Sequence, residues 1–220
     1  RDSHATGNIR IESEEAGGFV GSMSGNGSSI MRSYSTGDVF IGGARWGGGF
    51  AGRMLDVNPA IGGESISTIT IADTLVEPDE IGIHNSYATG DVTFTNGGYD
   101  ESIIITDTTI VQWTPEEFAS QGESFGGFVG ENRQSVTSNN YSTGRVIYDS
   151  PGFANPTTKG FAGAMTADGF YMSEDDIPLI NLNNYWNTET SQQSSSAGNA
   201  TPLTTSQMYQ QNTFNNWNFN

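Results

Sequence analysis

The stretch Ser33-Tyr34-Ser35-Thr36-Gly37-Asp38-Val39 decides the fold, because near copies of it recur along the chain. Residues 86–92 read Ser-Tyr-Ala-Thr-Gly-Asp-Val and residues 140–146 read Asn-Tyr-Ser-Thr-Gly-Arg-Val, while more divergent copies begin at Ser3 and Asn184. Self-similarity of this kind is the signature of a repeat architecture, in which each unit buries its apolar side chains by stacking on its neighbours.

A second unit alternates with the first one. It reads Gly-Gly-Phe-Val-Gly at residues 17–21 and 126–130, Gly-Gly-Phe-Ala-Gly at 48–52, and Gly-Phe-Ala-Gly at 160–163. Tyr, Thr, Val and Ile favour extended backbone, and Gly allows tight corners. The alternation therefore predicts an all-β chain that winds as a β-solenoid, also called a β-helix.

Each turn of such a coil is expected to place core residues at fixed positions. One aromatic core residue per repeat is predicted at Phe19, Phe50, Phe128 and Phe161. Tyr34 and Val39 are expected to face inward on either side of a corner that Gly37 makes at positive φ. Equivalent rings would then stack at the spacing of neighbouring strands, about 4.8 Å. The alternative is a platform of exposed tyrosines that binds carbohydrate, which requires the rings to lie on an outer face.

The spacing of the repeats predicts the domain organisation. The tyrosine position recurs at His4, Tyr34, Tyr87, Tyr141 and Tyr185, at intervals of 30, 53, 54 and 44 residues. We therefore expect a solenoid over residues 1–183 with insertions at about 54–82 and 95–123. The β-rich runs at 66–71 and 103–111 suggest hairpins or extra strands that project from one side.

Residues 184–220 are predicted to form a C-terminal capping segment. Thr204 or Thr205 is expected to N-cap a short helix that runs to about Asn212. Phe214, Trp217 and Phe219 are expected to lie over the open end of the core, where unpaired strand edges would otherwise favour aggregation.

The composition excludes several classes of function. The 220 residues include 25 acidic and 8 basic ones, and the net charge of −17 argues against binding to nucleic acid or to anionic membrane surfaces. No apolar stretch approaches the roughly 20 residues of a membrane span, so direct membrane insertion is not expected. The absence of cysteine removes disulfides and thiolate chemistry. Because the chain starts inside a repeat, we expect it to be a piece of a longer protein.

The alternation of Asn-Ser-Tyr-Ala-Thr-Gly-Asp-Val, at residues 85–92, with Gly-Gly-Phe-Val-Gly resembles the GLUG-motif repeats of bacterial surface adhesins. Such repeats occur in filamentous-haemagglutinin-like adhesins and in the exteriors of immunoglobulin-A peptidases. The resemblance covers about two thirds of the chain, and it departs from the family pattern at the phenylalanines that replace Leu and at His4, Arg145 and Lys159. It implies an extracellular or cell-surface localisation.

The leading functional hypothesis is a non-catalytic structural or adhesive module of a secreted or cell-surface protein. The repeats would form the scaffold and the insertions the contact surface. Its expected partners are other parts of a longer parent chain, neighbouring subunits, glycans or a host or cell-surface protein. The alternatives are a carbohydrate-binding β-helix that uses Tyr99, Trp113 or Tyr148, a filament subunit that stacks through its open N-terminal edge, and a polysaccharide-cleaving β-helix enzyme.

Few residues suggest chemistry, and we predict no catalytic residue and no bound cofactor. His4 stands at a tyrosine position and is expected to be structural, whereas His84 is expected at the surface of a turn or strand. No motif supports a Ser-His-Asp arrangement. The weak candidates for a metal site are the carboxylates of Glu174, Asp175 and Asp176, for which calcium is the suited ion.

Overall fold

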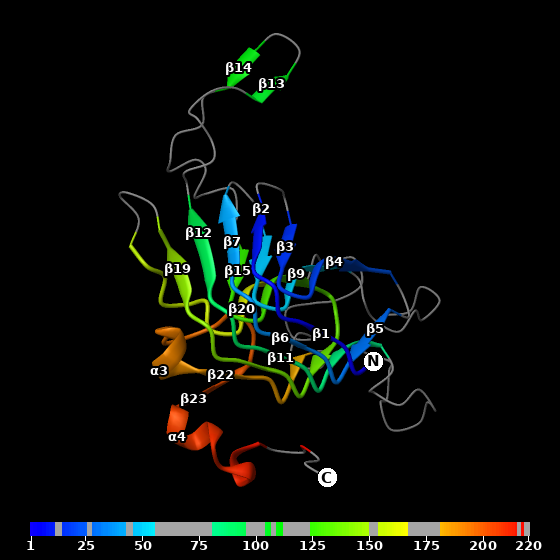
Figure 1. The fold of residues 1–220 in the computed structure, drawn as a ribbon, viewed down its shortest axis with the longest axis vertical. Helices are drawn as coiled ribbons and strands as arrows, with labels where there is room; N and C mark the ends of the chain where they lie inside the picture. Colours follow the sequence, from blue (N-terminus) through cyan, green and yellow to red (C-terminus); the bar gives the residue numbers. More distant parts are fainter. Residues whose placement is uncertain are drawn as a thin grey trace.

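The structure is a computed structural model that describes residues 1–11, 15–25, 28–42, 46–55, 81–95, 104–106, 109–111, 124–149, 154–166, 181–214 and 217. Within these residues the chain is all-β, with a few short helices near the C-terminus (Figure 1). Five sheets contain only parallel strand pairs, and a sixth is an antiparallel hairpin of β13 (Ile104–Thr106) and β14 (Thr109–Val111).

The first two parallel sheets contain the strands of the Tyr-x-Thr-Gly-x-Val unit. Sheet A consists of β1 (His4–Ala5), β6 (Tyr34–Ser35), β11 (Tyr87–Ala88), β18 (Tyr141–Ser142), β22 (Tyr185–Asn187) and β23 (Thr201–Leu203). Sheet B consists of β2 (Ile9–Ile11), β7 (Val39–Gly42), β12 (Val92–Thr95) and β19 (Val146–Tyr148).

The other three parallel sheets contain the Gly-Gly-Phe unit and the strand that follows it. Sheet C consists of β3 (Glu15–Gly17), β8 (Trp46–Gly48) and β15 (Ser124–Gly126). Sheet D consists of β4 (Val20–Ser24), β9 (Ala51–Leu55), β16 (Val129–Arg133) and β20 (Ala162–Thr166). Sheet E consists of β5 (Ser29–Met31), β10 (Gly82–His84), β17 (Thr137–Ser138) and β21 (Asn181–Leu182).

The chain passes through sheets A to E in order and then returns to sheet A beside the strand that it left, except that the round beginning at β18 has no described strand in sheet C. We call one such passage a round. Equivalent residues of successive rounds pair in register, as Tyr34 does with Tyr87, and Tyr87 with Tyr141. Parallel pairing of sequence repeats in register is consistent with a β-helix.

Phenylalanines form the centre of the core, as predicted. Phe19, Phe50, Phe128 and Phe161 stack in one column, with ring centroids 4.8, 4.9 and 4.8 Å apart. The inner three are completely buried, whereas Phe19 at the N-terminal end is only partly buried. Val39, Ile41, Phe94 and Phe125 lie in a second buried cluster beside this column.

The tyrosines do not face inward, so that prediction was wrong. Adjacent residues of a strand point to opposite faces, and in sheet A the buried position belongs to the small residues Ser35, Ala88 and Ser142. The reason is the narrow interior at this level, where a Cβ added to Gly49 would lie 3.1 Å from the Cβ of Ala88. A tyrosine ring does not fit there.

The corners also differ from the expectation. Positive φ angles occur at Asp2, Arg32, Asn85, Asn139 and Asn183, two residues before each tyrosine position, and not at Gly37. Gly37 and its equivalents instead permit close contact between rounds. A Cβ on Gly90 would lie 2.0 Å from the carbonyl oxygen of Gly37, well inside van der Waals contact.

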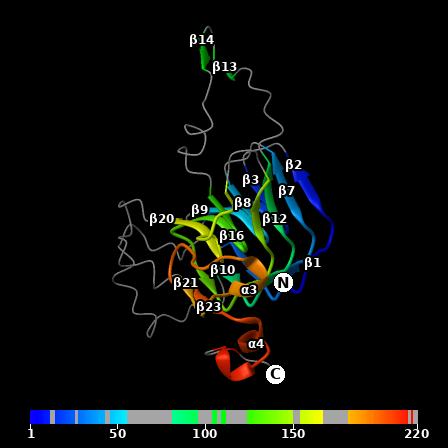
Figure 2. The same cartoon turned by 90° about the vertical axis from the view of Figure 1, so that its left-hand side faces the viewer.

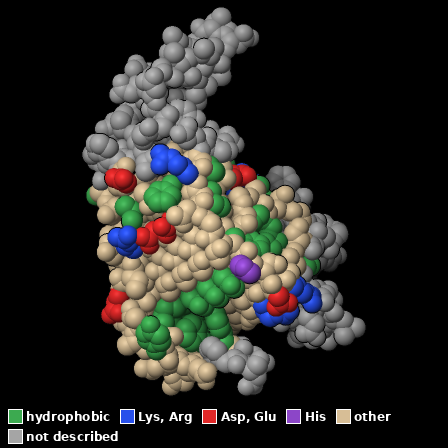
Figure 3. Space-filling view, viewed as in Figure 1, with side chains coloured by type: hydrophobic (Ala, Val, Ile, Leu, Met, Phe, Trp, Pro, Cys, Tyr) green, Lys and Arg blue, Asp and Glu red, His purple; other side chains and the backbone are tan. Residues whose placement is uncertain are grey.

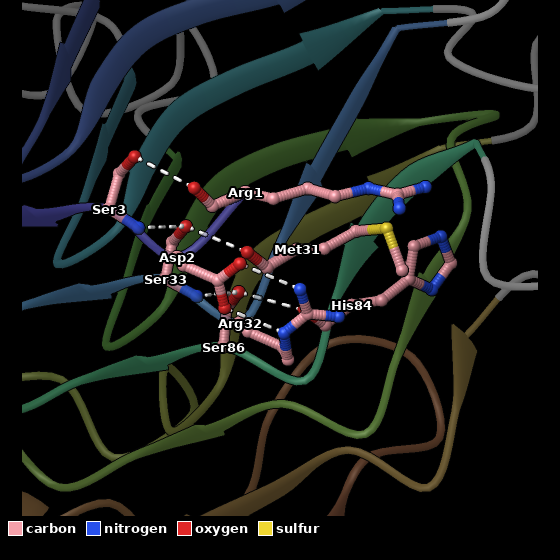
Figure 4. A network of polar contacts seen from close by, with 8 residues as sticks. All are labelled: Arg1, Asp2, Ser3, Met31, Arg32, Ser33, His84 and Ser86. Atoms are coloured by element: carbon pink, nitrogen blue, oxygen red, sulfur yellow. Dashed lines mark hydrogen bonds and ion pairs between the residues drawn. The ribbon is translucent and has the colours of Figure 1, made fainter.

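A buried polar ladder follows each of these corners. The Ser33 amide donates to Ser86 Oγ at 3.1 Å, the Ser86 amide to Asn140 Oδ1 at 2.9 Å, and the Asn140 amide to Asn184 Oδ1 at 3.0 Å. Figure 4 shows the N-terminal end of this ladder at Ser3, Ser33 and Ser86. Each buried polar group thereby obtains a partner from the next round.

The two insertions are connected to the rounds at different corners, and the prediction that they project from one side lies outside the described residues. Residues 56–81 separate β9 in sheet D from β10 in sheet E, whereas residues 96–123 separate β12 in sheet B from β15 in sheet C. The strands themselves continue to Leu55 and Thr95 and resume at Gly82 and Ser124. The run at 103–111 contains the predicted hairpin, and the run at 66–71 lies outside the described residues.

The C-terminal segment closes the last round with different side chains from those predicted. Trp186 takes the inward position of Ser142 and is buried against the phenylalanine column, and the amides of Phe161 and Ala162 donate to Ser196 Oγ. Phe214 and Trp217 contact the outer tyrosines instead of the core. Phe219 lies outside the described residues.

Three short helices accompany this segment (Figure 2). They are α3 (Thr188–Ser191), α4 (Thr205–Met208) and the 3-10 helix η3 (Gln211–Thr213). Thr204 caps α4 in a capping box with Gln207, so the predicted cap is confirmed, but the α-helix is shorter than expected.

Candidate ligand-binding face

The outer face of sheet A carries three parallel columns of side chains, which we call the sheet A face. The corner column consists of Asp2, Arg32, Asn85, Asn139 and Asn183. The tyrosine column consists of His4, Tyr34, Tyr87 and Tyr141. The threonine column consists of Thr6, Thr36, Thr89 and Thr143, which follow the paired strands at equivalent positions. The columns arise because every second residue of the repeat unit points outward.

The tyrosine column is a continuous aromatic stack. Its successive ring centroids are 5.1, 5.0 and 5.0 Å apart, with interplanar angles of 10° or less. Tyr34, Tyr87 and Tyr141 are half-buried, and His4 is exposed. Figure 3 shows the resulting band of hydrophobic side chains over β6, β11 and β22. Because the rings cover one another, they present their edges and hydroxyl groups to solvent.

The two flanking columns add regularly spaced polar groups. Thr6, Thr36 and Thr89 are exposed, and each hydroxyl can both donate and accept a hydrogen bond. In the corner column, Asn183 Nδ2 donates to Asn139 Oδ1 at 3.3 Å. The face therefore presents a hydroxyl group from each threonine, a phenol from Tyr34 onward and an amide from Asn85 onward, in rows that follow the rounds.

The environment of the column changes the ionisation of its phenols. Burial, together with the neighbouring Tyr87, raises the pKa of Tyr141 to about 12. Burial, together with the neighbouring Tyr34, also raises the pKa of Tyr87. Both phenols are therefore neutral hydrogen-bonding groups at physiological pH.

The sheet A face contains little net charge. At its N-terminal end the Arg32 guanidinium binds both carboxylate oxygens of Asp2 at 2.7 Å (Figure 4), and this contact lowers the pKa of Asp2. The net charge of the chain is concentrated elsewhere in the sequence. Residues 56–80, 96–123 and 167–180 contain 16 of the 25 acidic residues and none of the 8 basic ones, which leaves nine acidic residues against eight basic ones in the rest of the chain.

The C-terminal segment already occupies one end of this face. Tyr185 continues the tyrosine column in register but is only 2% exposed, because Phe214 packs against it edge-to-face at 5.0 Å. Trp217 lies 6.0 Å from both Tyr141 and Tyr185, and its indole N–H donates to the Asn183 carbonyl oxygen. The open part of the face therefore extends from His4 to Tyr87.

The residues predicted as ligand contacts lie elsewhere. Tyr148 is half-buried at the end of sheet B, where its ring packs edge-to-face on Phe94 at 5.6 Å and on Phe125 at 6.1 Å. This position gives it a packing role, and ligand contact by Tyr148 stays a prediction. Tyr99, Trp113 and the calcium candidates Glu174, Asp175 and Asp176 lie outside the described residues.

His84 is buried, so its predicted place at the surface was wrong. Because a carbonyl oxygen only accepts hydrogen bonds, Nε2 donates to the Ile81 carbonyl oxygen at 2.5 Å, and Nδ1 accepts from the Ser138 hydroxyl at 2.7 Å. A Ser–His pair of this kind could activate a nucleophile. Both side chains are buried, however, and their contacts hold β10 against β17.

No group of three or more His, Cys, Asp or Glu side chains in the described part of the chain could hold a metal ion. No helix in this part is long and apolar enough to cross a membrane.

No protein-family model, curated protein or solved structure matches this chain.

Proposed function

We propose that this chain is a non-catalytic adhesive module of a secreted or cell-surface bacterial protein, built as a β-solenoid of GLUG-like repeats. The observation that carries the proposal is the pairing of equivalent repeat residues through successive rounds. His4, Tyr34, Tyr87, Tyr141 and Tyr185 are paired from one strand to the next without a register shift. Such stacks present long, regular outer surfaces, which repeat proteins commonly use for binding.

The sheet A face is the adhesive surface in this proposal. A tyrosine can contact a ligand only from an outer face, and the half-buried rings of Tyr34 and Tyr87 lie on one. A contiguous exposed apolar band with polar edges marks an interaction site more often than scattered apolar residues do. The acidic insertions stay a second proposed contact surface.

Binding of the labelled, purified chain to intact cells and to extracellular matrix tests the proposal. Thr36→Glu places a charge on the sheet A face, whereas Ser22→Glu places the same charge at an exposed position of sheet D. We expect Thr36→Glu to lower binding about tenfold or more and Ser22→Glu to leave it unchanged, with equal thermal unfolding of both variants. Equal binding of the two variants would exclude the sheet A face as the adhesive surface.

One observation favours a filament subunit as the second candidate. In the described part of the chain, strands β1 to β5 each pair on one side only, and Phe19 is the only member of its column that is not completely buried. Sedimentation at rising concentration tests this candidate. The filament candidate is supported if the chain self-associates, if Phe19→Asp abolishes this self-association, and if a substitution at the exposed Tyr209 leaves it unchanged.

A further inference from the structure

We propose that the sheet A face binds a neutral polysaccharide chain that lies along the stack of rounds, perpendicular to the strands. This inference rests on the proposed adhesive function and names its ligand class. Successive phenols and threonines repeat at about the ring spacing of 5.0 Å. A polymer of identical units can repeat the same contacts at successive rounds, which a globular protein surface cannot do.

On this face, the backbone of the described sheet A strands has no free hydrogen-bonding groups with which a peptide strand could pair. Strand addition uses the unpaired N–H and C=O groups at a sheet edge. Within the open part of the face, the Tyr34 and Tyr87 amides donate to the carbonyl oxygens of Ser3 and Ser33 in the preceding round. Binding must therefore use side chains alone.

The side chains of the face suit a polyhydroxylated ligand. Its three columns offer amides, phenols and hydroxyls, each of which both donates and accepts hydrogen bonds. Sugar hydroxyls have the same dual capacity, so each contact can be satisfied in either direction. The ring edges supply apolar contact, because the flat faces of Tyr34 and Tyr87 are already covered by their neighbours in the stack.

The distribution of charge points to a neutral ligand. Asp2 and Arg32 are the only Asp, Glu, Lys or Arg residues of the three columns, and they form an ion pair with each other. No cluster of cations is present on the face to attract sulfated or carboxylated sugars. The overall charge of −17 would repel such polymers at long range.

The C-terminal segment defines one end of the site. Trp217 contacts Tyr141, and Phe214 covers Tyr185, so the polysaccharide would contact His4, Tyr34 and Tyr87 and stop at the indole. Trp217 is therefore placed to pack on the terminal sugar unit. Binding should change its fluorescence.

Titration calorimetry of the full chain with linear uncharged β-linked glucose and N-acetylglucosamine oligosaccharides of increasing length tests the inference. We expect affinity to rise with length and then to reach a plateau. Tyr87→Phe, which keeps the ring stack but removes one hydroxyl, should weaken binding about threefold to tenfold, the usual effect of one hydrogen bond. Thr36→Glu should abolish binding, and Ser22→Glu should not change it.

The outcomes separate the ligand class from the adhesive function. One outcome would keep the adhesive function but overturn the inference of a polysaccharide ligand. In that outcome Thr36→Glu abolishes cell-surface binding, neutral oligosaccharides do not compete with it, and protease treatment of the cells removes it. Preference for polygalacturonate over the neutral chains would also overturn it. Cell-surface binding that is indifferent to Thr36→Glu would contradict the proposed function itself.

Discussion

The hydroxyl of Ser35 donates a hydrogen bond of 2.6 Å to the carbonyl oxygen of Gly49 across the interior of the stack. Ser142 makes the equivalent bond to Gly160 in a later round, at 3.0 Å. These bonds hold sheet A close to the Gly-Gly unit, and only Ser or Ala occupies the inward position of β6, β11 and β18. The short distance is what turns the tyrosine column outward.

Enlarging Ser35 should therefore destabilise the stack. We expect Ser35→Leu to lower the free energy of unfolding by about 1–3 kcal/mol, because a larger side chain overpacks this gap. Ser35→Ala should cost only about 1 kcal/mol, since Ala88 occupies the same position in the next round. Urea unfolding of both variants measures the difference, and equal stability would contradict a narrow interior.

The repeat glycines offer a second matched pair. A Cβ on Gly90 would lie 2.0 Å from the Gly37 carbonyl oxygen, whereas a Cβ on Gly7 would have no atom within 4 Å. We expect Gly90→Ala to destabilise the fold by about 1–3 kcal/mol and Gly7→Ala to have little effect. A large effect of Gly7→Ala in thermal unfolding would show that another segment covers the N-terminal round.

The corner column should respond to backbone preference. Asn85 has a φ of 52°, a left-handed conformation that Asn and Gly tolerate better than other residues do. Asn85→Ala should cost about 1–2 kcal/mol of unfolding free energy, whereas Asn85→Gly should be nearly neutral. If the alanine and glycine variants unfold at the same urea concentration, backbone conformation does not explain this column.

Alkaline pH should weaken the tyrosine column. The unfolded phenol of Tyr141 loses its proton near its ordinary pKa of 10.0, whereas the folded one keeps its proton until pH reaches about 12. The folded state therefore binds more protons in this range, and stability falls as pH rises from 10.0 to about 12. Tyr141→Phe should lack this part of the decline. The comparison requires unfolding curves at several pH values, and parallel declines would contradict the raised pKa.

The first insertion should be dispensable for the stack. Residues 56–81 connect β9 to β10, and residues 25–28 make the equivalent connection from β4 to β5. Loop length has a weak effect on stability. We expect a variant in which residues 25–28 replace residues 56–81 to fold with unchanged strand content by circular dichroism. Loss of cooperative unfolding would show that the segment is part of the scaffold.

The phenylalanine column was predictable because Gly-Gly-Phe places one large apolar residue among glycines in every repeat, and such a residue has no other means of burial than the core. His84 was not predictable in the same way. A histidine next to Asn85 reads as a surface residue, and only the contacts with Ser138 and Ile81 reveal its burial. For the sheet A face, the sequence predicted only that a tyrosine platform could bind a ligand if its rings lay on an outer face.

The sequence by itself determined that equivalent repeats stack, because Tyr34, Tyr87 and Tyr141 recur with the same neighbours and can pair with one another in register. It also determined the high net negative charge. Only the tertiary structure decided which way the tyrosines point. Alternation in a strand places Tyr34 and Ser35 on opposite faces but does not say which face is inside, and that choice depends on the distance to Gly49, a residue of another sheet.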